Sequence, residues 1–342
     1  MGSITDKLIS QNKISPPNFI KNNVHFEVQM GSVAYGCSND HSDIDIYGFC
    51  IPPKDVIFPH LKGIIHGFGR QVQEFNQFQQ HHIKCDEKEY DISIFNIVRY
   101  FQLAFENIPN VLDSLFVPRR CILHSTLVGE KIRENRHLFL SKKAFYSMKG
   151  YAYSQLKKAK EKYAVSFVEF CQKYNFPLTL TNEELNESGL NVDIIKNGHF
   201  LISKIEQSGP RTKRLESIAK FGFDPKFLYH VVRLVLQAEQ ILMECDLDLE
   251  KNKEQLKAVR RGEWSLIQIE EFFTDKEKQL ESLYVTSTTR YSPDEQIIKS
   301  LLLECLGMHY ENLNDCIVDV DMSVTALREI QKITDSVLSI IK

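Results

Sequence analysis

Apolar and polar residues alternate in short stretches near the N-terminus and follow a helical period further on. The period-two stretches, which are typical of strands with one buried face, are 24–30 (VHFEVQM), 44–51, a region within 63–84, and 89–95. From about residue 95 the period becomes helical, and helices are expected over 95–105, 111–116, 122–136 and 141–163 and through most of the chain after 175. Strands followed by helices predict an α+β fold.

Glycine, serine and proline residues locate two of the boundaries between these predicted elements. Gly31, Ser32 and Gly36 lie between the first two predicted strands, so the strands bracket a glycine loop. Ser292 and Pro293, followed by Glu295, predict the start of a late helix, with Ser292 as its cap.

Composition indicates an ordinary globular protein. The residues are 43% hydrophobic and 25% charged. The length of 342 residues favours two domains, and the change from alternating to helical periods divides them into a head at 1–120 and a helical domain at 121–342. A net charge of -3 excludes a generally basic nucleic-acid coat protein, so any RNA contact is expected to be local. The eight cysteines form no CxxC pair, and neither a secretion signal nor a membrane-spanning stretch is found. We therefore expect a cytoplasmic protein without membrane contact, and the sequence indicates no oligomeric state.

Three acids and a glycine turn carry the candidate chemistry. Asp43 and Asp45 are two residues apart on a predicted strand, so their side chains share a face, and Asp91 lies on a later strand that can pair beside it. Such carboxylates repel one another unless a divalent cation lies between them, and hard oxygen ligands suit Mg²⁺. Gly31 and Ser32 suit phosphate, because glycine lets backbone amides approach closely and serine adds a donor. The combination favours nucleotidyl transfer with two Mg²⁺ ions, for which Mn²⁺ is an alternative.

The motif GSVAYGCSNDHSDIDIYGFCIPP resembles the signature of the DNA polymerase β-type nucleotidyltransferase superfamily, and specifically the RlaP family of predicted nucleotidyltransferases associated with RNA repair. The likeness extends over most of residues 24 to 270. It implies a polymerase β-type catalytic head, with a mixed sheet flanked by helices, followed by a mostly helical C-terminal domain. It also implies that Gly31 and Ser32 bind phosphate and that Asp43, Asp45 and Asp91 are the catalytic metal ligands. At 221–226 the chain reads FGFDPK where the family usually has a Tyr-Gly-Tyr-Asp-x-Lys start, so two hydroxyls are missing.

Further nucleotide contacts are expected outside the acid motif. Lys226, His230 and Arg233 are spaced to share one helical face and suit a triphosphate, although an ordinary cationic helix surface has the same spacing. Tyr35 is a candidate to stack on or bond to the nucleotide, and packing beside the loop is the alternative reading.

Two basic segments favour an RNA acceptor, such as tRNA or an RNA-repair end. Residues 141–162 carry seven lysines interleaved with aromatic residues, and residues 211–214 add Arg211, Lys213 and Arg214. A helix with a solvated lysine face and an aromatic core face gives the same pattern, and for the aromatic residues we favour the core. The alternatives to RNA are transfer of NMP onto a protein or small molecule, and a non-catalytic nucleotide- or RNA-binding module.

Two other features are assigned to structure. His81, His82 and Cys85 lie too close together, without a matching pair elsewhere, to favour zinc, and we place them in a loop or strand. Trp264 is expected to be a packing residue.

Overall fold

A computed structural model describes residues 2–38, 44–58, 61, 74–86, 88–159, 224–311, 327, 329–335 and 337. Its strands are β1 (Val24–Gln29), β2 (Ile44–Cys50), β3 (Gln77–Cys85), β4 (Lys88–Asn96) and β5 (Ile122–Ser125). Its helices are α1 (Ile4–Ser10), α2 (Lys54–Ile57), α3 (Ile97–Phe105), α4 (Pro109–Phe116), α5 (Leu127–Glu134), α6 (Lys143–Ala159), α11 (Pro225–Glu244), α12 (Lys253–Arg260), α13 (Leu266–Thr286) and α14 (Glu295–Tyr310). Short 3-10 helices lie at Asn18–Ile20, Gly31–Val33, Arg119–Cys121 and Arg136–Phe139.

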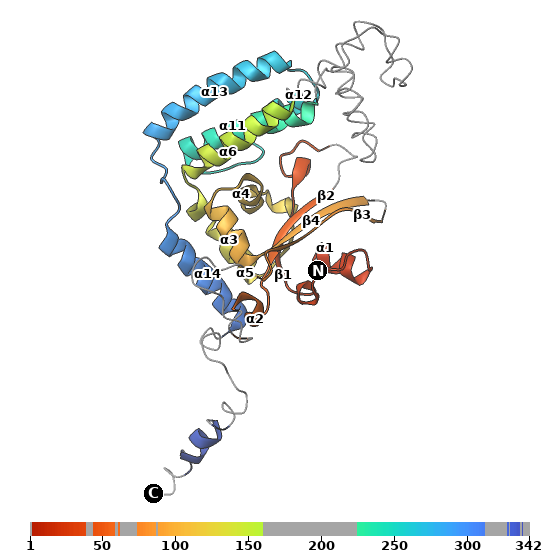
Figure 1. The fold of residues 1–342 in the computed structure, drawn as a ribbon, viewed down its shortest axis with the longest axis vertical. Helices are drawn as coiled ribbons and strands as arrows, with labels where there is room; N and C mark the ends of the chain where they lie inside the picture. Colours follow the sequence, from red (N-terminus) through yellow and green to blue (C-terminus); the bar gives the residue numbers. More distant parts are fainter. Residues whose placement is uncertain are drawn as a thin grey trace, which may run out of the picture.

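The strands form one mixed sheet in the order β3-β4-β2-β1-β5. β1 pairs antiparallel with β2 and with β5, β3 pairs antiparallel with β4, and β2 and β4 run parallel. The structure therefore confirms the α+β prediction, with a sheet in the N-terminal part and a mostly helical C-terminal region (Figure 1).

Alternation along the strands separates two apolar layers. Ile46, Ile92 and Ile94 face a smaller cluster that includes Leu8 of α1. Phe49 and Phe95, which alternate with these isoleucines along β2 and β4, point to the other face of the sheet and join the main core. α3 and α4 cover that face (Figure 1). α6, α11 and α13 stack beyond these helices, and their buried residues belong to the same main core.

The predicted strands at 24–30, 44–51 and 89–95 and the helix from residue 95 are confirmed. Within 63–84 the described residues form β3, and 62–73 lie outside the described part of the chain. The expected helix over 122–136 is wrong at its start, because residues 122–125 form β5 on the free edge of β1 and Thr126 caps the helix that follows. Ser292 is not the cap of α14, since the side chain of Asp294 accepts the first amide hydrogen bonds.

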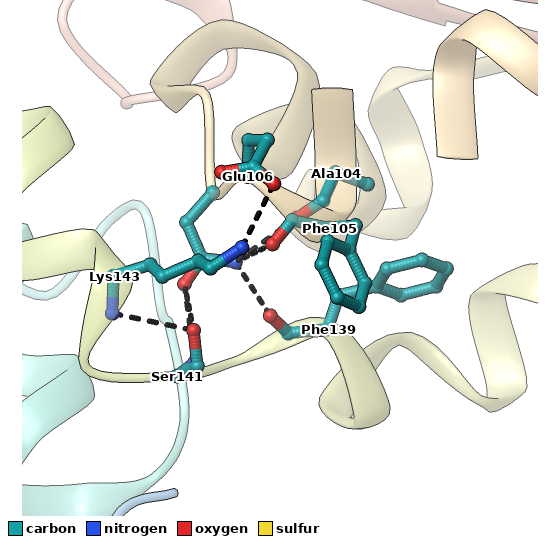
Figure 2. Close-up of polar contacts among 7 residues, drawn as sticks. Ala104, Phe105, Glu106, Phe139, Ser141 and Lys143 are labelled. Atoms are coloured by element: carbon teal, nitrogen blue, oxygen red, sulfur yellow. Dashed lines mark hydrogen bonds and ion pairs between the residues drawn. The ribbon is translucent and has the colours of Figure 1, made fainter. Parts of the chain in front are cut away.

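A buried asparagine fixes where α6 begins relative to α3. Asn107 has a positive φ of 52° just after α3. Its Nδ2 donates to the carbonyls of Ala104 and Phe139, and its Oδ1 accepts from the amide and hydroxyl of Ser141. Lys143 adds an ion pair with Glu106 at 2.8 Å (Figure 2). These bonds connect the C-terminal end of α3 to the first turn of α6.

Of the helices in the described part of the chain, none has the length and apolar character needed to cross a membrane. The described cysteines, which are Cys37, Cys50, Cys85, Cys121, Cys245 and Cys305, are free thiols. The cytoplasmic location stays a prediction.

Candidate active site

The glycine turn at the end of β1 lies directly against Asp45. The amide of Met30 donates to the carbonyl of Asp45 at 2.7 Å, and the chain then enters the 3-10 turn Gly31–Val33. Gly31 has a φ of 70°, where side chains are disfavoured. A Cβ at this position would overlap Oδ2 of Asp45 and lie 3.2 Å from its Cγ. Glycine is therefore required by the backbone and by the carboxylate beside it.

Asp45 and Asp91 are paired across the two parallel strands of the sheet. In the β2–β4 register Asp45 lies opposite Asp91, and Tyr47 lies opposite Ser93. Residues in register on adjacent strands point to the same face, so the two carboxylates share one face about 5 Å apart at the backbone. Asp43 lies outside the described residues.

A bulge in β3 holds Asp91 from the opposite side. The β3–β4 register shifts between Gln80 and Ile83, and His82 has a φ of 57°. At this bulge the amide of His82 donates to Oδ1 of Asp91 at 2.8 Å, and Nδ1 of His81 lies 3.3 Å from Oδ2. Both histidines lie on the strand β3, one of the two settings, loop or strand, expected from the sequence. Their contact with Asp91 was not expected from the sequence.

Within the described residues no three His, Cys, Asp or Glu side chains gather as a metal site. Asp45 and Asp91, the oxygen ligands expected from the sequence, share one face.

Tyr35 and Arg233, both expected at the nucleotide, meet inside the protein. The hydroxyl of Tyr35 donates to Oδ2 of Asp113 at 2.6 Å, and Nη1 of Arg233 contacts both that hydroxyl and, at 3.3 Å, the same carboxylate oxygen. Burial raises the pKa of Asp113 above its usual value, and Arg233 and the hydrogen bonds from Tyr35 and Gln237 offset only part of this rise. Sequence reasoning missed Asp113, whose only local signal was its position as the one charged residue of the segment NVLDSLF.

Lys226 and His230 lie on the same helix as Arg233, towards its N-terminus. Lys226 is exposed in the first turn of α11. His230 is half-buried, and its Nδ1 is a buried atom without a hydrogen-bond partner among the described residues. Burial, followed by the charges of Arg233, Lys226 and Arg260, lowers the pKa of His230 well below its usual value. His230 is therefore neutral at pH 7 and can offer a hydrogen bond but no charge. The segment 221–223, where the two hydroxyls are missing, lies outside the described residues.

Cationic side chains from outside the turn hold its far end. Arg120 donates to the carbonyl of Val33 at 3.2 Å and pairs with Glu250, and Arg260 donates to the carbonyl of Cys37 at 2.9 Å. Gly36 has a φ of 64°, which disfavours a side chain, and a Cβ there would lie 2.8 Å from Oε1 of Glu250. The turn is thus fixed from Gly31 to Cys37.

Two aromatic side chains on the outer face of α6 are exposed to solvent. Phe145 is buried as expected, but Tyr146 and Tyr153 are 61% and 62% exposed, so the prediction that the aromatic residues belong to the core is wrong for these two. Lys149 pairs with Glu277 and Glu281 of α13. Residues 160–162 and 211–214 of the predicted basic segments lie outside the described residues. Trp264 is half-buried and packs against Phe272, as expected.

A mixed sheet with paired carboxylates beside a glycine turn agrees with the class expected from the sequence, the DNA polymerase β-type nucleotidyltransferases. A family model confirms that class over residues 7–292, and the chain belongs to this family, RlaP, the RNA repair pathway DNA polymerase beta family. Family membership supports a nucleotidyltransferase activity.

Two further comparisons add little. No curated protein matches the chain. A nucleotidyltransferase-like protein from Exiguobacterium sibiricum is similar at 9% identity over 81% of this chain and 76% of that chain, with a TM-score of 0.25, a value too low to carry weight.

Proposed function

We propose that the protein is a Mg²⁺-dependent nucleotidyltransferase that moves NMP from an NTP onto a hydroxyl of RNA and releases pyrophosphate. The observation that carries the proposal is the register of β2 and β4, which sets Asp45 beside Asp91 on one face. The turn at Gly31, expected to bind phosphate, lies against the same carboxylate.

The residues present fit Mg²⁺. The ligand set consists of hard carboxylate oxygens, and Mg²⁺ uses few protein ligands while keeping positions for water and substrate phosphates. Asp45 and Asp91, with Asp43, would hold the two ions, or Mn²⁺ in their place. When bound, the ions stabilise the charge on the attacking and leaving oxygens of an in-line displacement.

The side chains of this protein have distinct roles in the proposed reaction. Gly31 and Ser32 bind the β and γ phosphates, while Lys226 contributes a positive charge and His230 a hydrogen bond. Asp91 would complete the metal site beside the acceptor, which helps to lower the pKa of the acceptor hydroxyl, and its carboxylate would accept the proton that this hydroxyl releases. The acceptor oxygen forms a bond to the α phosphorus as the bond to the bridging oxygen breaks, and pyrophosphate leaves.

Two observations support RNA as the acceptor. The description of the family refers to an RNA repair pathway. In addition, the exposed tyrosines of α6 lie on a helix that also carries exposed Lys157 and Lys158. Aromatic rings beside cations suit unpaired bases and their phosphates.

The test is transfer of label from each α-labelled NTP to total RNA with Mg²⁺. Asp45→Asn and Asp91→Asn are each expected to reduce transfer by roughly a hundredfold or more, because charge stabilisation at the phosphorus is lost. Asp246→Asn is the matched control, since Asp246 has the same Asp-x-Asp spacing but pairs with His137 at the far end of α11. Equal transfer by Asp45→Asn and the control would refute the proposal.

Salt dependence distinguishes RNA from other acceptors. Labelling of RNA is expected to fall as salt rises, because phosphate contacts release counterions. Labelling of a protein or small molecule instead, with no response to salt, would keep the reaction and replace the acceptor. Nucleotide binding that needs no Mg²⁺, without any transfer, would favour a binding module.

A further inference from the structure

We infer that Asp113 is a positioning residue that holds the phosphate-binding turn and α11 in a fixed relation, an inference that rests on the proposed function for its catalytic consequence. Asp113 lies on α4, Tyr35 follows the turn, and Arg233 and Gln237 lie on α11. One carboxylate therefore connects three separate segments.

Within the described part of the chain, the Asp113 carboxylate bonds to side chains inside the protein. Oδ2 accepts from Tyr35 at 2.6 Å and lies 3.3 Å from Nη1 of Arg233, and Oδ1 accepts from Nε2 of Gln237 at 3.1 Å. Asp113 is fully buried, and Tyr35, Arg233 and Gln237 are 2%, 3% and 4% exposed. The guanidinium of Arg233 also stacks over the ring of Tyr35, 4.4 Å from its centre. The hydroxyl of Tyr35 and Nη1 of Arg233 thus make their contacts inside the protein.

The position of Tyr35 sets the position of the turn. Successive backbone bonds join Ala34 to Gly31, Gly36 to Val33 and Cys37 to Ser32, at 3.2, 3.1 and 2.8 Å. Tyr35 lies within this bonded run, so a displacement of its hydroxyl is transmitted to Gly31 and Ser32.

The position of Arg233 sets the position of the helix face that carries Lys226 and His230. These residues lie two turns and one turn before Arg233 on α11. Asp113 thus aligns the two sets of groups expected to bind the triphosphate, although it contacts none of the reacting atoms itself.

Asp113→Asn, which keeps the size of the side chain, is the test variant. It leaves Arg233 without its carboxylate partner, and the turn is expected to loosen. The KM for the NTP should rise about tenfold while the KM for the acceptor stays within about twofold, because only the phosphate groups are displaced. Amide hydrogen exchange of residues 31–37 should become faster.

Glu27→Gln is the matched control. Glu27 is also a fully buried carboxylate, and it accepts from the amides of Ile4 and Thr5 at 2.6 and 3.0 Å, on the α1 side of the sheet. Its loss should lower thermal stability without changing the NTP KM or the exchange of residues 31–37. If Asp113→Asn folds poorly, Tyr35→Phe removes only the hydroxyl and should give the same pattern with a smaller rise in KM.

The readouts separate this inference from the proposed function. Absence of transfer by the unmodified protein would refute the function, while hydrogen exchange of residues 31–37 would still decide the role of Asp113. If Asp113→Asn and Tyr35→Phe match Glu27→Gln in that exchange and in NTP KM, Asp113 is only a stabilising residue and the inference is wrong.

Discussion

At the scale of single residues, the site depends on how closely backbone and carboxylate approach at Gly31. The positive φ and the position of Asp45 Oδ2 each disfavour a side chain at this position. The two effects have different consequences, because strain in the backbone lowers stability wherever it occurs. Displacement of Asp45, by contrast, affects the proposed chemistry.

Gly31→Ala is therefore expected to reduce nucleotidyl transfer more than tenfold, at a cost of about 1–2 kcal/mol in the free energy of unfolding. Gly262→Ala provides the control, since Gly262 also has a positive φ, of 74°, beyond the end of α12. Activity assays and urea unfolding of both variants check the prediction. Equal activity in the two variants would show that contact with Asp45 is unimportant.

The residues predicted from the sequence are those whose chemistry is local. Gly31 is indicated by the glycine turn between two predicted strands, and Asp45 and Asp91 are indicated by their positions on predicted strands. Asp113 could not be found in this way, because its partners Tyr35 and Arg233 are remote in the sequence. Nothing in one helix indicates which distant hydroxyl and guanidinium will meet its carboxylate.

At the scale of elements, the end of α14 brings a histidine against β1. The ring of His309, near the end of α14, meets His25 of β1 edge to face with centres 4.8 Å apart. His25 also contacts the hydroxyl of Thr126 at 2.9 Å. Burial, followed by His309 and His124, lowers the pKa of His25 to about 4.

This pKa predicts acid sensitivity in a defined window. The unfolded chain, with a histidine pKa of about 6.5, binds a proton between pH 6.5 and 4 that folded His25 does not bind. The free energy of unfolding is therefore expected to fall as pH falls through this window, by about 2 kcal/mol after allowance for partial exposure.

Urea unfolding at pH 7 and pH 4.5 measures this loss. His25→Gln should lose less stability on acidification than the unmodified protein. An equal loss in His25→Gln and the unmodified protein would rule out His25 as the source.

Helices and strands with a clear hydrophobic period were predicted from the sequence. Elements whose form depends on contacts with distant parts of the chain were not. β1, β2 and β4 alternate cleanly, but β5 has only four residues, ILHS, whose apolar pattern also suits the start of a helix. Only the open edge of β1 selects the strand. Similarly, Ser292 and Asp294 are both good caps, and the choice depends on where α14 packs.

At the scale of the whole molecule, sheet and helices share one core. Its buried members include Phe49 from the sheet, Leu112 from α4, Leu228 from α11 and Leu301 from α14. The division into 1–120 and 121–342 stays a prediction, and the sheet itself extends to Ser125.

A continuous core predicts a single cooperative unfolding transition. Fluorescence of Trp264, the single tryptophan, reports on the helical region, and alkylation of the buried thiol of Cys50 reports on β2. Their urea midpoints are expected to coincide. Separate midpoints would instead favour two independently unfolding units.

The parallel pairing of β2 with β4 has a consequence for synthesis of the protein. Asp45 emerges from the ribosome early, but its partner Asp91 reaches the same face only when β4 docks in register, and a slip by one residue would turn Asp91 to the opposite face. Partly folded or nascent chains therefore lack the acid pair, and competence for the proposed metal-dependent chemistry arises only once this long-range contact has formed.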